Sequence, residues 1–109
     1  MEQKEKVLAL MISRRGKQEW FYAPDFMKPE LGDLFVGYEA SARMTDVAKQ
    51  YPYMIDVKKD GKYRWIRFRF EAIDEIFRIA GPVMVAFLDT MFMRYGVSKA
   101  QGEKKLPLF

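Results

Sequence analysis

Apolar residues recur at helical spacing in three stretches of the chain. Residues 2–13 combine strong helix formers with a broad apolar face, and residues 38–50 bring apolar side chains to one face at intervals of three and four. Residues 71–95 are apolar around most of a helix axis and contain Gly81 followed by Pro82. Because proline lacks the N–H that a helix interior needs, we predict three main helices, the last of them kinked or broken at residues 81–82.

Between the second and third of these helices the pattern changes to that of a β-hairpin. Residues 54–58 and 63–70 are predicted to form two strands joined by residues 59–62, whose Asp60 and Gly61 favour a tight turn. Since strand side chains alternate between faces, the mostly apolar face of the second strand should meet the core and the other should face outward. The inward set is Arg64, Ile66, Phe68 and Phe70, and the outward set is Tyr63, Trp65, Arg67 and Arg69.

Shorter elements are expected between the first two main helices. The aromatic run at residues 20–22 predicts a brief strand, and Pro24 suits the first position of a short helix over residues 24–27. Residues 28–37 contain one proline and two glycines and are predicted to form a loop. With 109 residues, half of them hydrophobic, the chain is expected to fold around one core as a single domain.

The basic charge of the chain is unevenly distributed. The net charge is +4, from 19 basic and 15 acidic residues. Residues 1–70 hold 14 basic and 10 acidic side chains, whereas residues 71–109 hold five of each, so the excess lies in the first part of the chain. A local excess of Lys and Arg favours a polyanionic partner. The densest run of cations is residues 58–69, in the predicted hairpin.

The absence of cysteine and histidine excludes several kinds of chemistry. Disulfides, thiolate nucleophiles, zinc sites of the usual kind and histidine acid–base catalysis are all ruled out. The carboxylate pairs Asp74 with Glu75 and Glu30 with Asp33 are expected to lie on a solvated face. We therefore expect a protein that is not an enzyme and that uses no metal or cofactor.

The chain carries no signal-peptide pattern at its beginning, and its longest uncharged run is ten residues, 79–88. That run is about half of what a membrane span needs. We expect a cytoplasmic protein with no membrane partner.

The predicted order of helix, short strand, helix, helix and hairpin resembles that of a winged helix-turn-helix domain. The sequence YEASARMTDV at residues 38–47, followed by Tyr51 and Pro52 and by the Gly61-centred hairpin, is similar to small phage and plasmid proteins of this class. The resemblance covers residues 4–70, although the loop at residues 28–37 is longer than the turn of the simplest members. It implies a mostly helical α+β fold with a winged helix over residues 1–70. The residue pattern beyond it predicts an added helix over residues 71–96 and a flexible tail over residues 97–109.

This resemblance implies binding to double-stranded DNA, in transcription control or in replication of a mobile element or virus. The helix at residues 38–50 would enter the major groove, where Arg43 could read guanine, and the hairpin would contact phosphates or a minor groove. The implied nucleic-acid-binding residues are Ser41, Arg43, Thr45, Lys49, Lys58, Lys59, Lys62, Arg64, Trp65, Arg67 and Arg69.

Each of these assignments has a plainer alternative. A basic hairpin can be a solvated edge strand whose cations prevent pairing with other chains. Arg43 stands at helical spacing from Glu39 and Asp46 and could form salt bridges with them. The aromatic run at residues 20–22 is more typical of packing than of a binding platform, whereas Trp65 would suit stacking on bases.

The last helix is too apolar to remain uncovered, which predicts either a homodimer or a helix folded back onto its own domain. The residues predicted for a dimer interface are Ile76, Ile79, Val83, Phe87 and Met91.

The chain ends in an apolar trio that resembles the pentapeptide by which replication and repair proteins dock on the bacterial sliding clamp. Leu106, Leu108 and Phe109 match its apolar anchors, and Lys105 stands where glutamine is preferred. The alternative function is therefore a protein-interaction adaptor that uses a winged-helix scaffold and docks on a replication clamp through this tail. The plainer alternative is that this trio occurs by chance or packs on the chain's own domain.

Overall fold

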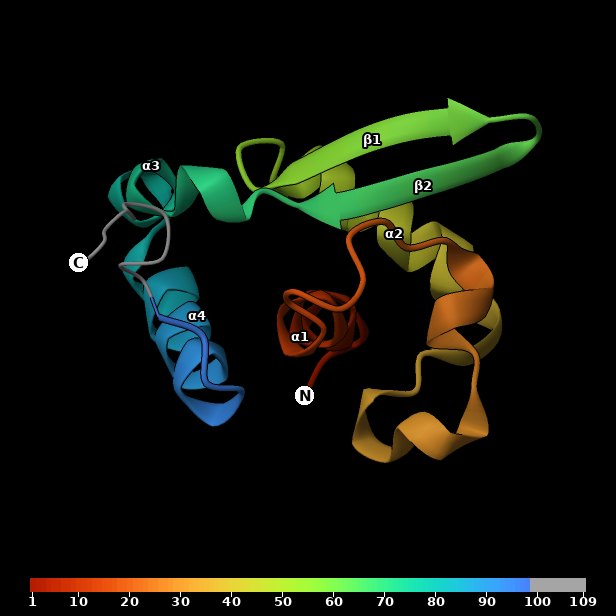
Figure 1. The fold of residues 1–109 in the computed structure, drawn as a ribbon, viewed down its shortest axis with the longest axis horizontal. Coiled ribbons are helices and arrows are strands. Elements are labelled where there is room, and N and C mark those ends of the chain that lie inside the picture. The colour runs from red at the N-terminus through yellow and green to blue at the C-terminus, as the bar shows by residue number, and fades with distance from the viewer. Residues whose placement is uncertain (99–109) are drawn as a thin grey trace.

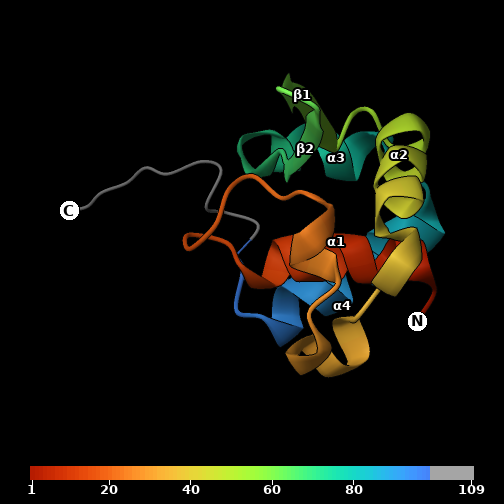
Figure 2. The same cartoon turned by 90° about the vertical axis from the view of Figure 1, so that its right-hand side faces the viewer.

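Helix α1 (Gln3–Ser13) lies at the centre of the fold, as seen in the computed structural model, which describes residues 1–98 (Figure 1). The Glu5 carboxylate accepts a hydrogen bond of 2.9 Å from the backbone N–H of Glu2 and so caps the start of the helix. All side chains from Val7 to Ile12 are buried, because other elements contact α1 on several sides. In Figure 2 the helix crosses the middle of the molecule, with the hairpin above it and α4 (Pro82–Arg94) below it. The predicted first helix is thus confirmed.

The chain approaches α2 (Ala40–Gln50) through three short 3-10 segments. They cover Ala23–Phe26, Pro29–Leu34 and Gly37–Glu39, so the second of them lies inside the predicted loop. Helix α2 begins at Ala40 rather than at residue 38, because the residues before it form a 3-10 turn, which starts at Gly37 with a positive φ of 85°. A Cβ at Gly37 would lie 3.1 Å from the Phe35 ring, so both the backbone angle and the space favour glycine there.

The hairpin consists of β1 (Ile55–Asp60) and β2 (Tyr63–Phe68) in antiparallel register. The turn is shorter than predicted and uses Gly61 with a φ of 65°. The brief strand predicted at residues 20–22 is a single bridge, in which Phe21 and Ile66 exchange two backbone hydrogen bonds of 2.8 Å. Phe21 and Ile66 are buried, so their neighbours on either side project from the opposite surface of the sheet, which we call the outer face.

The helix predicted over residues 71–95 is broken close to the expected position, into α3 (Ile73–Ile79) and α4. A 3-10 segment at Phe70–Ala72 leads into α3. Ala80 ends α3 in an extended conformation with a ψ of 142°, and Pro82 occupies the first turn of α4, where its missing N–H costs nothing. The break folds α4 back beside α1. The α4 side chains Leu88, Met91 and Phe92 are part of the core. The described fold is therefore mostly helical α+β, with one hairpin after α2 and two helices after the hairpin.

The chain leaves α4 through a tight turn. Gly96 has a φ of 70°, and the N–H of Val97 donates to the Phe92 carbonyl at 2.8 Å. Val97 is buried, so the tail predicted over residues 97–109 does not begin at that residue. The tail residues Leu106, Leu108 and Phe109 lie outside the described residues. Among residues 1–98, no helix has the length and apolarity that crossing a membrane requires.

Candidate nucleic-acid interface

Arg43, the cation on α2 that was predicted to contact bases, already forms ion pairs with two carboxylates. The Arg43 guanidinium lies 3.3 Å from a Glu39 carboxylate oxygen and 3.1 Å from an Asp46 carboxylate oxygen. The two carboxylates stand four residues before and three residues after Arg43, the spacings at which helix side chains meet. Contact between Arg43 and a guanine edge would require both ion pairs to open, so the salt-bridge alternative describes this residue.

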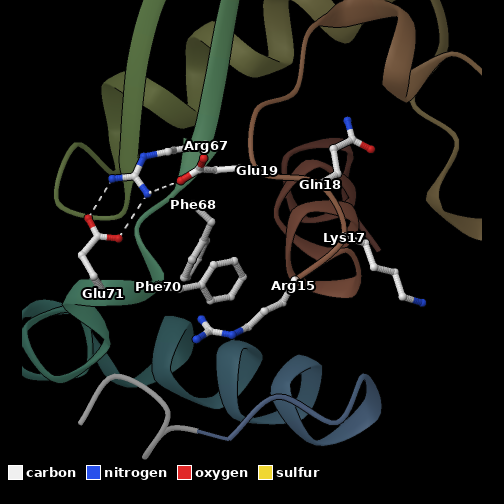
Figure 3. A pocket seen from close by; sticks show the side chains of 9 residues that line it. Arg15, Lys17, Gln18, Glu19, Arg67, Phe68, Phe70 and Glu71 are labelled. Atoms are coloured by element: carbon white, nitrogen blue, oxygen red, sulfur yellow. Dashed lines mark hydrogen bonds and ion pairs between the residues drawn. The ribbon is translucent and has the colours of Figure 1, made fainter. Parts of the chain in front are cut away.

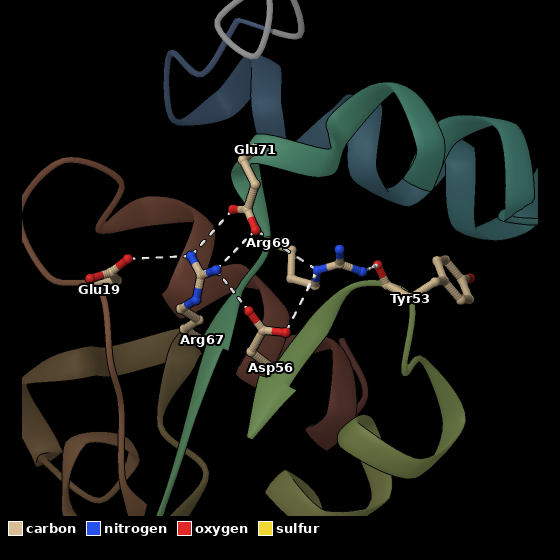
Figure 4. A network of polar contacts seen from close by, with 6 residues as sticks. All are labelled: Glu19, Tyr53, Asp56, Arg67, Arg69 and Glu71. Atoms are coloured by element: carbon tan, nitrogen blue, oxygen red, sulfur yellow. Dashed lines mark hydrogen bonds and ion pairs between the residues drawn. The ribbon is translucent and has the colours of Figure 1, made fainter. Parts of the chain in front are cut away.

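The two arginines at the base of the hairpin belong to an ion-pair network, which we call the base cluster (Figure 4). Arg67 lies 2.7 Å from Asp56, 2.9 Å from Glu71 and 3.3 Å from Glu19. Arg69 lies 3.6 Å from Asp56 and 3.8 Å from Glu71, and it donates to the Tyr53 carbonyl at 3.1 Å. The strand register explains the shortest pair, because Asp56 stands directly opposite Arg67. With three carboxylates around two guanidinium groups, the base cluster has no spare positive charge for phosphates.

The charges of the base cluster reinforce one another. Burial opposes the charge of Arg67, but its hydrogen bonds and charge interactions with Glu71 and Asp56 prevail and raise its pKa. Burial likewise opposes ionisation of Glu71, but a backbone hydrogen bond and the contacts with Arg67 and Arg69 hold the pKa of its carboxyl below the ordinary value. Both groups stay charged at neutral pH, so the cluster ties the end of β2 to the start of the C-terminal helices.

The variant Glu71→Gln should be less stable than the parent protein at neutral pH and should lose less stability in acid. A carboxyl with a lowered pKa contributes stability that is present above its unfolded pKa and is lost as the pH falls through its folded pKa. Glu71 is partly solvated, so we expect a difference below about 1 kcal/mol at pH 7. Urea unfolding at pH 7 and at about pH 3 measures both effects. A gap between the two proteins that stays constant over this range would contradict the assignment.

The outer face of the sheet carries aromatic rings that pack on one another. Trp65 stacks on Tyr22 with the ring centroids 4.3 Å apart, and the Lys58 ammonium lies 4.2 Å from the centroid of Trp20 and 6.0 Å from that of Trp65. One face of Trp65 is therefore covered by Tyr22 and is not available to a base. The run at residues 20–22 is thus used for packing, with Phe21 in the core and its two neighbours against the hairpin.

A second set of cations surrounds a groove between α2 and the far end of the hairpin, which we call the tip groove. The groove has a volume of about 300 Å³. The Arg64 guanidinium donates to the Thr45 hydroxyl at 2.6 Å, and that hydroxyl donates to the Ser41 carbonyl at 3.1 Å. No carboxylate lines the groove within the part of the chain that the structure describes. Its lining residues are Tyr22, Ala23, Ser41, Met44, Lys59, Lys62, Tyr63 and Arg64.

Alternation along the strands explains why the hairpin cations separate. Lys59 and Arg64 stand opposite each other in the register and project to the side of the sheet that faces α2. Arg67 projects from the outer face, beside Trp20 and Asp56. Arg64 was predicted on the core-facing side, and it does lie there, but it is exposed because the tip extends beyond the core. Lys49 is exposed in the last turn of α2 and does not line the groove.

Two of the five residues predicted for a dimer interface are packed inside the chain's own core. Ile76 and Met91 are 0% and 3% exposed, so neither side chain is accessible to a partner in this fold. Ile79 and Val83 are 50% and 84% exposed, and Phe87 is half-buried. The break at residues 80–81 explains the burial of Ile76 and Met91, because it turns one face of each short helix toward the core.

The two carboxylate pairs expected on a solvated face are exposed: Glu30, Asp33, Asp74 and Glu75 all lie on the surface. Comparison of the chain with protein-family models, with curated proteins and with solved structures finds no match.

Proposed function

We propose that this chain binds double-stranded DNA through the tip groove, on a scaffold of the winged-helix type. The observation that carries the proposal is the set of three cations, Lys59, Lys62 and Arg64, around a groove lined by no carboxylate among residues 1–98. Phosphate contacts supply most of the sequence-independent affinity for DNA, and they require cations that are not already neutralised. The tip groove meets this requirement, whereas the base cluster and Arg43 do not.

The order and pairing of the elements support the winged-helix scaffold. Helix α1 is followed by the bridge at Phe21, a 3-10 turn, α2 and the hairpin, and the bridge adds a third strand position beside β2. The segment between the 3-10 turn at Ala23–Phe26 and α2 is longer than the tight turn of the simplest winged helices. In this proposal the exposed residue Ser41 approaches the duplex from α2 and the hairpin tip contacts the backbone.

A salt series with three nucleic acids tests this proposal. Fluorescence anisotropy would measure binding of the chain to a labelled random duplex, the matching single strand and an RNA hairpin at several salt concentrations. We expect the duplex to bind most tightly. The logarithm of its association constant should fall by about 2–3 units for each tenfold rise in salt concentration, because about three phosphates are contacted. Affinity that does not respond to salt, or a preference for the single strand or for RNA, would overturn the proposal.

A second candidate, a protein-interaction adaptor, is favoured by three exposed apolar side chains in the segment before α2. Tyr38 is 98% exposed, and Phe35 and Met27 are 38% and 37% exposed. Exposed apolar side chains mark a protein interface when they form one contiguous patch. Such an adaptor could also use Leu106, Leu108 and Phe109 to dock on a clamp and the exposed Ile79 and Val83 to form a homodimer. Binding of a bacterial sliding clamp that is lost on deletion of residues 106–109, without any DNA binding, would favour this function.

A further inference from the structure

We propose that a second cavity, at the C-terminal end of α1, binds a small organic anion through Arg15. The cavity has a volume of about 490 Å³ and is formed by residues 15–19, 67, 68, 70 and 71 (Figure 3). This volume falls within the range of small-molecule sites in proteins. The cavity shares no lining residue with the tip groove, so this inference does not rest on the proposed DNA binding.

The guanidinium of Arg15 is the cation that an anionic ligand would contact. This guanidinium lies over the Phe70 ring, 4.4 Å from the centroid. Figure 3 shows the two side chains next to each other. The Nη1 atom of Arg15 is shielded from solvent and has no hydrogen-bond partner within residues 1–98. Burial lowers the pKa of Arg15, and the charge of Glu71 only partly opposes this effect. The residue as a whole is only partly buried and lines the cavity, so an anion in the cavity would meet the positive charge of the guanidinium.

The pairing of the other charges around the cavity favours an anion over a cation. The carboxylates of Glu19 and Glu71 lie 3.3 Å and 2.9 Å from the Arg67 guanidinium, which neutralises both in part. Arg15 has no carboxylate within ion-pair distance among the described residues, and Lys17 adds an exposed cation at the edge of the cavity. An anion entering the cavity therefore meets two cations outside the base cluster.

The remaining wall of the cavity indicates the rest of the ligand. Phe68 and Phe70 line it, with ring centroids 4.7 Å apart, and Phe70 is only partly buried. Apolar walls with a few convergent polar groups are typical of sites for small organic molecules. The ligand class is therefore a carboxylate or phosphate group carried on a small aromatic or aliphatic body. The anionic group would meet Arg15, and the body would lie against Phe70.

Calorimetric titration of the full chain with benzoate, phenyl phosphate, inorganic phosphate and the neutral benzamide tests this site. We expect the two organic anions to bind, inorganic phosphate to bind more weakly and benzamide not to bind. The relative affinities of benzoate and phenyl phosphate distinguish a carboxylate from a phosphate ligand. Arg15→Gln should weaken organic-anion binding by at least about tenfold, because a charged hydrogen bond is removed. The matched variant Arg78→Gln removes an exposed cation on α3, outside the cavity, and should bind as the parent does.

Three results would overturn the inference: no binding by either organic anion, equal binding of benzoate and benzamide, or equal binding by Arg15→Gln and the parent. If Arg15→Gln does not fold, the side-chain Nε–H resonance of Arg15 in the parent protein decides the matter. That resonance should shift on addition of phenyl phosphate, and an unchanged resonance would count against the site. None of these results depends on whether the chain binds DNA.

Discussion

Replacing Lys59, Lys62 and Arg64 together with glutamate will weaken duplex binding by at least about 100-fold at low salt, because each replacement removes a cation that meets a phosphate and adds a repelling charge. The dependence of affinity on salt should shrink as well, by about one unit of logarithmic slope for each phosphate that the variant no longer neutralises. These three side chains are exposed and form no ion pair within residues 1–98, so the variant should remain folded. Anisotropy with a labelled duplex measures both changes, and circular dichroism checks the fold.

The matched control for this variant changes the net charge by the same amount elsewhere. Lys17, Lys28 and Arg78 are exposed cations outside the tip groove, and the triple glutamate variant at these positions also loses six units of charge. It should weaken binding far less, because only the long-range attraction falls. If the two triple variants bind DNA equally poorly, the affinity comes from net charge alone and the tip groove is not the binding site.

The second large effect is expected at the base of the hairpin. Arg67→Glu should reduce the free energy of unfolding by about 2–4 kcal/mol, because it brings a fourth carboxylate to Glu19, Asp56 and Glu71. The side chain of Arg67 is only 21% exposed, so solvent screens this repulsion incompletely. Urea unfolding at neutral pH measures the loss.

Arg64→Glu serves as the comparison for this prediction, because it makes the same change of charge three residues earlier in the same strand. Arg64 is exposed and contacts a hydroxyl group rather than a carboxylate, so the stability should change by less than about 1 kcal/mol. Equal unfolding midpoints for the two variants would show that the base cluster does not hold the hairpin in place.

Periodicity was sufficient to predict the main elements of this fold. The spacing of apolar residues located α1 and α2, and alternation with a central glycine located the hairpin to within two residues. The Gly81 and Pro82 pair indicated a break, but a proline signal does not define the direction in which the chain continues. For that reason Ile76 and Met91 were placed on a surface, although the fold turns both into the core.

The roles of the cations could not be derived from spacing along the chain. Arg64 and Arg67 belong to one strand and differ in role because their partners come from elsewhere: Thr45 from α2, and Glu19 and Asp56 from two other segments. Only the register, which places Asp56 opposite Arg67, could have suggested the base cluster from the sequence. The pairing of Arg43 was foreseeable, since both of its partners lie within one turn of α2.

The most direct test of the account is a titration of the isotope-labelled chain with a short DNA duplex, followed by amide chemical shifts. We predict that the largest shifts lie at Ser41, at Thr45 and over residues 59–64, which surround the tip groove or lie next to it. The amides of Asp56 and Arg67, in the base cluster, should change little. The largest changes at the base cluster or along the exposed face of α4, with none at the tip groove, would contradict the proposed mode of DNA binding.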